Sequence, residues 1–217
     1  DYIVVHHLEP DHAGSLQMTI EKYPEATLVL SAKALAMLPQ FFDLPAGTKT
    51  LSVKEGDTLE LGHHTLTFVM APMVHWPEVM VSYESTEKVL FSADGFGRFG
   101  AVAKFDEKAD WASEARRYYL NIVGKYGPQV QALLKKISAL EIKTICPLHG
   151  PVWRKDLGWF IEKYDTWSRY APETQGVLIV YASMYGNTEN AAQALATSLC
   201  DKGMSKVAMY DVSSTHV

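Results

Sequence analysis

This sequence has little cysteine, no long apolar run and no excess of positive charge. Its two cysteines, Cys146 and Cys200, are too few for a disulfide framework, so we expect a reducing, cytoplasmic setting. No apolar run approaches the roughly 18–20 residues of a membrane span, and we expect no membrane partner. The formal net charge of −5 argues against a nucleic-acid-binding surface.

The chain is long enough for one or two globular domains, with 217 residues of which 47% are hydrophobic. It opens with Asp1 inside an apolar run, and it stops at Val217 shortly after another expected strand. We therefore expect a fragment of a longer protein, cut at both ends.

Apolar patterning predicts that strands and helices are mixed along the chain. Short β-branched or alternating runs predict strands at residues 1–5, 27–30, 80–83, 89–92 and 144–146, with further β-structure across 49–71. Apolar residues at helical spacing predict helices at residues 13–23, 31–38, 110–123, 128–140 and 156–170.

Four side chains capable of binding metal fall within six residues at the end of the first expected strand. In an extended segment His7, Glu9 and Asp11 project to one side, and His12 follows as the backbone turns. For any single histidine, a polar surface loop is the simpler interpretation. The whole cluster favours a metal site.

Three further polar residues also follow expected strands. These are His75, Asp94 and His149. Taken alone, His75 fits a structural role and Asp94 fits an Asx-type turn in a glycine-rich segment. In layered α/β folds, however, the ends of strands are where sites are assembled, so we expect these residues to join the first cluster.

The pattern of these motifs resembles the metallo-β-lactamase superfamily, and most closely the flavodiiron proteins. The zinc hydrolases of that superfamily carry His-x-His-x-Asp-His, whereas this chain has Glu9 at the second position. The surrounding motifs are His75-Trp-Pro, Phe91-Ser-Ala-Asp94 and Leu148-His149-Gly-Pro-Val-Trp-Arg154. The resemblance implies an α/β fold, a four-layered αβ/βα sandwich that is incomplete at its N-terminus.

The resemblance also implies two non-haem irons as cofactors. A mixed nitrogen and oxygen ligand set suits such iron, whereas structural zinc favours cysteine and histidine. By resemblance, one iron is held by His7, Glu9 and His75, the other by Asp11, His12 and His149, and Asp94 bridges them.

A second module follows the first. Residues 171–176 read as a linker between a diiron domain at 1–170 and the truncated beginning of a flavodoxin-like domain at 177–217. The Ser-x-Tyr-Gly-Asn-Thr loop resembles the phosphate loop of a flavodoxin, and the helix after it directs its N-terminal dipole at an anion. The residues expected to bind FMN are Ser183, Met184, Tyr185, Gly186, Asn187 and Thr188.

The resemblance implies an FMN- and diiron-dependent oxidoreductase that reduces O2 to water or NO to N2O. It further implies electrons from a small carrier such as rubredoxin, and a head-to-tail homodimer. Two alternatives are a zinc hydrolase acting on thioesters or lactones, and a non-catalytic flavodoxin-like electron carrier. Glu9 and the second module disfavour the first alternative, and the intact ligand set disfavours the second.

Two aromatic residues are candidates for a supporting role at the metal pocket. Trp76 directly follows an expected ligand, and the resemblance places a tyrosine of Arg116-Arg-Tyr-Tyr119 near the pocket. We expect Tyr119 to supply a hydrogen bond or proton beside a bound diatomic molecule. The alternative for both residues is ordinary aromatic packing in the core.

Overall fold

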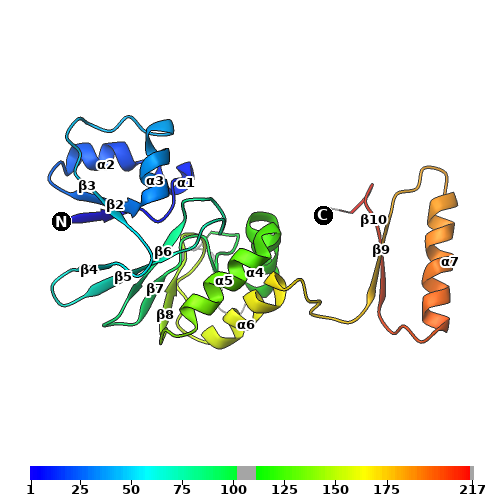
Figure 1. The fold of residues 1–217 in the computed structure, drawn as a ribbon. Helices are drawn as coiled ribbons and strands as arrows, with labels where there is room; N and C mark the ends of the chain where they lie inside the picture. The colour runs from blue at the N-terminus through cyan, green and yellow to red at the C-terminus, as the bar shows by residue number, and fades with distance from the viewer. Residues whose placement is uncertain (102–110, 216–217) are drawn as a thin grey trace. The chain divides into compact units, whose positions relative to one another are not determined.

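The computed structural model describes residues 1–101 and 111–215, which form two compact units, Asp1–Ala171 and Pro172–Val217 (Figure 1). None of the helices in the described stretches combines the length and the apolar character that crossing a membrane requires.

The first unit opens with a sheet of three parallel strands in the order β1-β2-β3. Its strands are β1 (Tyr2–Val4), β2 (Thr27–Ser31) and β3 (Thr50–Val53), and the helical segments between them are α1 (Pro10–Ala13), α2 (Leu16–Lys22), α3 (Ala32–Met37) and the 3-10 turn η1 (Leu38–Gln40). Alternation along β2 sends Leu28 and Leu30 into a core shared with α2 and α3, while Val29 faces the other way.

The second sheet has five strands in the order β4-β5-β6-β7-β8. They are β4 (Thr58–Glu60), β5 (Thr65–Met70), β6 (Met80–Glu84), β7 (Val89–Phe91) and β8 (Thr144–Cys146), and only the pair β7 and β8 is parallel. Its helical segments are α4 (Trp111–Tyr118), the π-helix η3 (Tyr119–Val123), the 3-10 turn η4 (Gly124–Tyr126), α5 (Gly127–Ile137) and α6 (Leu157–Ser168).

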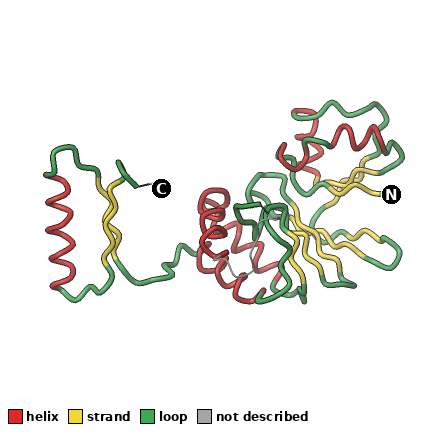
Figure 2. The backbone as a smooth tube through the Cα atoms, turned by 180° about the vertical axis from the view of Figure 1, so that it is seen from behind, coloured by secondary structure: helices red, strands yellow, loops and turns green. Residues whose placement is uncertain are grey.

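The two sheets pack face to face, with helices on their outer faces (Figures 1 and 2). Val29 and Val53 of the first sheet share a core with Phe68 and Met80 of the second. The opposite face of the second sheet packs against α4, α5 and α6 in a separate core. The order helix, sheet, sheet, helix confirms the predicted αβ/βα sandwich.

The helix predicted over residues 13–23 is two short helices. Pro10 starts a helical turn earlier than predicted, and the chain turns at Gly14 and Ser15 before α2 begins. The predicted helix over 110–123 starts at a residue, Asp110, that lies outside the described residues. It is described from Trp111 as α4, which continues into η3.

The second unit is one β-α-β element with β9 (Val177–Tyr181), α7 (Asn187–Asp201) and β10 (Val207–Asp211). The two strands are parallel and in register, with Val177 opposite Val207. Ile179 is 9% exposed, whereas its neighbours Leu178 and Val180 are 61% and 56% exposed. The sheet therefore buries one face and presents the other, which is apolar, to solvent.

This asymmetry predicts different costs for neighbouring substitutions. We expect Ile179→Thr to destabilise the second unit by about 1–3 kcal/mol, because it removes buried apolar surface and buries a hydroxyl. Val180→Thr is the matched control and should change stability little. Hydrogen exchange of the β9 and β10 amides measures both effects. Equal losses of protection in the two variants would contradict the assignment of faces.

Candidate metal centre

Loops that follow β1, β5, β7 and β8 bring seven imidazole and carboxylate side chains to one place. The structure forms two groups from them, each with its ligand atoms within 4.8 Å of one another. The first is His7, Glu9, His75 and Asp94, and the second is Asp11, His12 and His149. Every residue that the sequence analysis assigned to metal therefore lies in one of the two groups.

The first group is arranged around the Oε2 atom of Glu9. His7 Nε2 and His75 Nε2 each lie 3.1 Å from that oxygen. Asp94 adds its Oδ2 atom, which is 2.9 Å from His75 Nε2 and 3.7 Å from His7 Nε2. Three separate loops thus contribute two imidazoles and two carboxylates to one space.

The second group lies on the other side of the Asp94 carboxylate. Asp94 Oδ1 is 2.9 Å from His12 Nε2 and 4.0 Å from His149 Nε2. Asp11 Oδ2 is 3.1 Å from His149 Nε2. Asp94 therefore presents one oxygen to each group, as a bridging carboxylate between two cations does.

The buried polar atoms at this junction fit a pair of metal ions. His12 Nε2 and Asp94 Oδ1 are both buried and, within the described residues, neither has a hydrogen-bond partner of good geometry despite their short separation. Such atoms are costly to bury unless something else satisfies them. Burial would raise the pKa of Asp94, but its contacts with His12 and His75 outweigh burial and hold the pKa well below its usual range. The Asp94 carboxyl group is therefore ionised.

The Asp94 turn is held from both sides. The Phe96 backbone N–H donates to the Tyr164 hydroxyl at 2.7 Å, and Trp153 Nε1 donates to the Phe96 carbonyl at 3.1 Å. Ala93 and Phe96 have positive φ angles of 50° and 65°, which L-residues rarely adopt. These hydrogen bonds stabilise a turn that would otherwise be strained.

A buried glutamate supports the first group. Glu78 is 1% exposed, and its Oε1 accepts hydrogen bonds from His7 Nδ1 at 3.1 Å and from the Leu8 backbone N–H at 3.0 Å. Burial would raise the pKa of Glu78, but these hydrogen bonds outweigh it and lower the pKa below its ordinary value. The sequence analysis missed this residue. The feature that could have indicated it is an acidic residue directly after His-Trp-Pro and before a strand.

Trp76 lies where the sequence analysis expected it. Its ring meets the His7 ring edge-on, with centroids 5.2 Å apart, and also lies 5.8 Å from the ring of Phe41. Trp76 therefore closes one side of the first group.

The placement of Tyr119 beside the metal ligands is wrong. Its ring packs 5.0 Å from Tyr164 and 5.4 Å from Trp167, inside the core under α6. The preceding residue, Tyr118, is the one at the site, with its ring 5.4 Å from that of His149. A Cβ atom at Gly97 would lie 2.8 Å from Tyr118 Cε1, so glycine there lets the ring approach the Asp94 turn.

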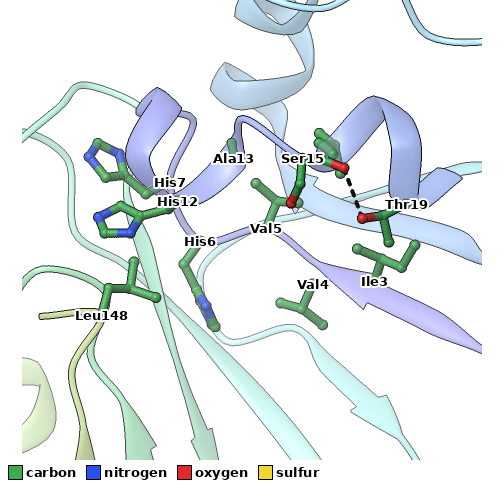
Figure 3. A pocket seen from close by; sticks show the side chains of 11 residues that line it. Ile3, Val4, Val5, His6, His7, His12, Ala13, Ser15, Thr19 and Leu148 are labelled. Carbon is green, nitrogen blue, oxygen red and sulfur yellow. Dashed lines mark hydrogen bonds between the residues drawn. The ribbon is translucent and has the colours of Figure 1, made fainter. Parts of the chain in front are cut away.

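A cavity of about 190 Å³ opens beside His7 and His12 (Figure 3). Its wall is mostly apolar and includes Val5, Leu16 and Leu148. His6 also lines it, although its ring is held away from the metal-binding groups by a 2.8 Å contact between Nε2 and Ser82 Oγ. Burial lowers the pKa of His6 to about 4, so this ring is neutral.

The loop expected to bind FMN lies at the start of α7 in the second unit. Gly186 adopts a left-handed φ of 81° and the helix begins at the next residue. Ser183 Oγ is buried and has no hydrogen-bond partner within the described residues, whereas Met184 and Tyr185 are both 86% exposed. A hydroxyl without a partner beside a helix N-terminus suits an anion.

A family model described as ODP family beta lactamase matches residues 1–150. Curated relatives include a nitric oxide reductase of Moorella thermoacetica, 36% identical over 221 residues, and a rubredoxin-oxygen oxidoreductase of Megalodesulfovibrio gigas, 36% identical over 227 residues. These alignments cover 97% and 100% of this chain, and 55% of each relative. The chain thus spans about half the length of the curated relatives it matches.

Solved structures show the same likeness. A flavodiiron protein from Giardia intestinalis superimposes with a TM-score of 0.88 at 32% identity, covering 99% of this chain and 53% of that one. The rubredoxin:oxygen oxidoreductase from Desulfovibrio gigas gives a TM-score of 0.86 at 36% identity, covering 100% of this chain and 55% of that one.

The hydrogen bond from Phe96 to Tyr164 can be tested directly. Tyr164→Phe keeps the ring but leaves the buried Phe96 N–H without its acceptor, so we expect a loss of about 1–3 kcal/mol in the free energy of unfolding. Tyr119→Phe is the matched control, because Tyr119 packs beside Tyr164 and its hydroxyl has no hydrogen-bond partner within the described residues. Chemical denaturation measures both variants, and equal losses would contradict this role for Tyr164.

Proposed function

Since this chain belongs to the ODP family of β-lactamase-like domains, we propose that it carries the diiron centre of an oxidoreductase that reduces O2 to water or NO to N2O. The observation that carries the proposal is the Asp94 carboxylate, whose two oxygens face two separate ligand groups. The names of the relatives support both gases as substrates.

The ligand set supports iron over zinc. Four imidazoles and three carboxylates form a mixed nitrogen and oxygen set without cysteine, which suits non-haem iron. His7, Glu9 and His75 would hold one iron, Asp11, His12 and His149 the other, and Asp94 would bridge them. Bound iron would pass electrons from the flavin to a diatomic molecule and would offer open coordination positions for it.

Tyr118 takes the supporting role that the sequence analysis assigned to Tyr119. Burial and the nearby carboxylate of Asp94 raise the pKa of Tyr118 well above its ordinary value. Its hydroxyl therefore stays protonated and acts as a hydrogen-bond donor beside the metal ligands. Trp76 and Phe41 exclude water from the side near His7.

We assign FMN to the loop of the second unit. The hydroxyl and amide side chains of Ser183, Asn187 and Thr188 would hold the phosphate, together with the backbone N–H groups at Met184, Tyr185 and Gly186. The unpartnered Ser183 Oγ supports this assignment. A small electron carrier such as rubredoxin would reduce the flavin, and a head-to-tail homodimer would bring the flavin of one protomer near the irons of its partner.

Metal analysis of the purified full-length protein tests the proposal, because we expect the fragment alone to be inactive. We expect close to two irons per chain, and a protein that contains zinc instead would support a hydrolase of the same fold. Glu9→His replaces a hard oxygen ligand with an imidazole, so we expect a shift toward zinc and loss of reductase turnover. Glu25→His, at a side chain that is 89% exposed, is the control. Unchanged iron content and turnover in Glu9→His would contradict the proposal.

The two neighbouring tyrosines give a matched pair for the supporting role. Tyr118→Phe deletes only the hydroxyl, and we expect turnover to fall roughly tenfold to a hundredfold, as losing a hydrogen bond to a charged group implies. Tyr119→Phe should leave turnover unchanged. Steady-state O2 and NO reduction by the full-length dimer, measured alongside iron content and Tm, distinguishes them. Full activity of Tyr118→Phe toward both gases would contradict this role and would mean that Tyr118 only packs in the core.

A further inference from the structure

We propose that Glu78 is a positioning residue that fixes the tautomer and the orientation of the His7 ring for metal binding. The proposal rests on the metal centre described above and assigns a function to a residue outside the ligand set. Among the described residues, the polar contact of the Glu78 side chain with the two groups is to His7, which it meets through Nδ1 at 3.1 Å.

The chemistry of imidazole explains why this contact matters. A neutral ring carries its proton on one nitrogen only, and the carboxylate of Glu78 holds that proton on Nδ1. Nε2 is then left with its lone pair, directed at the space shared with Glu9 Oε2 at 3.1 Å and Asp94 Oδ2 at 3.7 Å. A carboxylate on the far nitrogen also makes the imidazole a stronger ligand.

Burial makes His7 dependent on a protein partner. The side chain of His7 is 0% exposed, whereas those of His12, His75 and His149 are 12%, 13% and 34% exposed. Their contacts with carboxylates in the described part of the chain all use Nε2. Water can reach those three rings, but the Nδ1 of His7 has Glu78 as its acceptor.

The position of Glu78 is itself fixed by hydrogen bonds. The Leu8 N–H donates to the same oxygen, Oε1, that accepts from His7, so the carboxylate cannot rotate without losing both bonds. The Glu78 carbonyl accepts from Ser31 Oγ at 2.8 Å, and that hydroxyl also accepts from the Ala34 N–H at the start of α3. Glu78 thus connects the ligand loop to the junction of β2 and α3.

Two substitutions separate the roles of shape, acceptor and charge. Glu78→Gln keeps the shape and an oxygen that can accept from both His7 and Leu8, but removes the charge. Glu78→Met keeps a similar length and removes the acceptor. Glu84→Gln is the matched control, because Glu84 is also a buried glutamate (7% exposed) that contacts a histidine, His64, at 3.1 Å and accepts backbone N–H bonds, away from the metal groups.

The first measurement needs no metal. In metal-free protein labelled with 15N at histidine, at a pH where the 15N chemical shifts of His7 show a neutral ring, we expect His7 in the Nδ1–H tautomer in the wild type. Glu78→Gln should retain this tautomer, and Glu78→Met should give a mixture or the Nε2–H form. An Nε2–H tautomer in the wild type, or an unchanged tautomer in Glu78→Met, overturns the proposal.

The second measurement is titration with Co2+, followed by its absorption spectrum. We expect affinity at the site containing His7 to fall about 10- to 100-fold in Glu78→Met, less in Glu78→Gln, and not at all in Glu84→Gln. Wild-type affinity in Glu78→Met overturns the proposal. If Glu78→Met does not fold, the tautomer of His7 in the wild type and the Co2+ affinity of Glu78→Gln test the proposal instead. If the wild type binds no metal, the proposed function fails while the tautomer measurement still tests Glu78.

Discussion

The structure depends on holding one buried carboxylate, Asp94, between two groups of charged and polar side chains. A buried carboxylate is costly unless cations or hydrogen-bond donors surround it. Here the neighbouring imidazoles come from the segments that follow β1, β5 and β8. Within the described residues, His12 Nε2 and Asp94 Oδ1 still lack hydrogen-bond partners. The fold must therefore bring four strand ends into one small space, and the sandwich does this by stacking its two sheets.

Strand register sets which side chains reach this space. His6 and His7 are neighbours in sequence, yet His6 contacts Ser82 and His7 contacts Glu9 and Glu78. A shift of this segment by one residue along the sheet would put His6 in the place of His7, so the wrong imidazole would enter the site. The hydrogen bond from the Met80 N–H to the His6 carbonyl, 3.1 Å, fixes the ligand loop against the second sheet.

Local patterns predicted which strand ends carry the imidazoles and carboxylates, and the structure brings these side chains together in two groups. The cluster from His7 to His12 is contiguous, and strand ends explain His75, Asp94 and His149. Tyr118 and Tyr119 could not be told apart in this way, because adjacent helical residues point about 100° apart and the facing partner decides which one reaches the site. Here that partner is His149 for Tyr118 and Trp167 for Tyr119. Glu78 was missed for a related reason, since its function depends on contacts made about 70 residues away.

The clamp on the Asp94 turn also constrains the order of assembly during synthesis. Trp153 and Tyr164 both follow every residue of the two metal-binding groups in the chain. At about 5–20 residues per second, a ribosome needs roughly 7–28 s to pass from His7 to His149, and more to reach Tyr164. During that interval the nascent chain exposes a partial set of imidazoles and carboxylates to every divalent ion in the cell. The Asp94 turn can therefore take its final form only after Trp153 and Tyr164 have been synthesised.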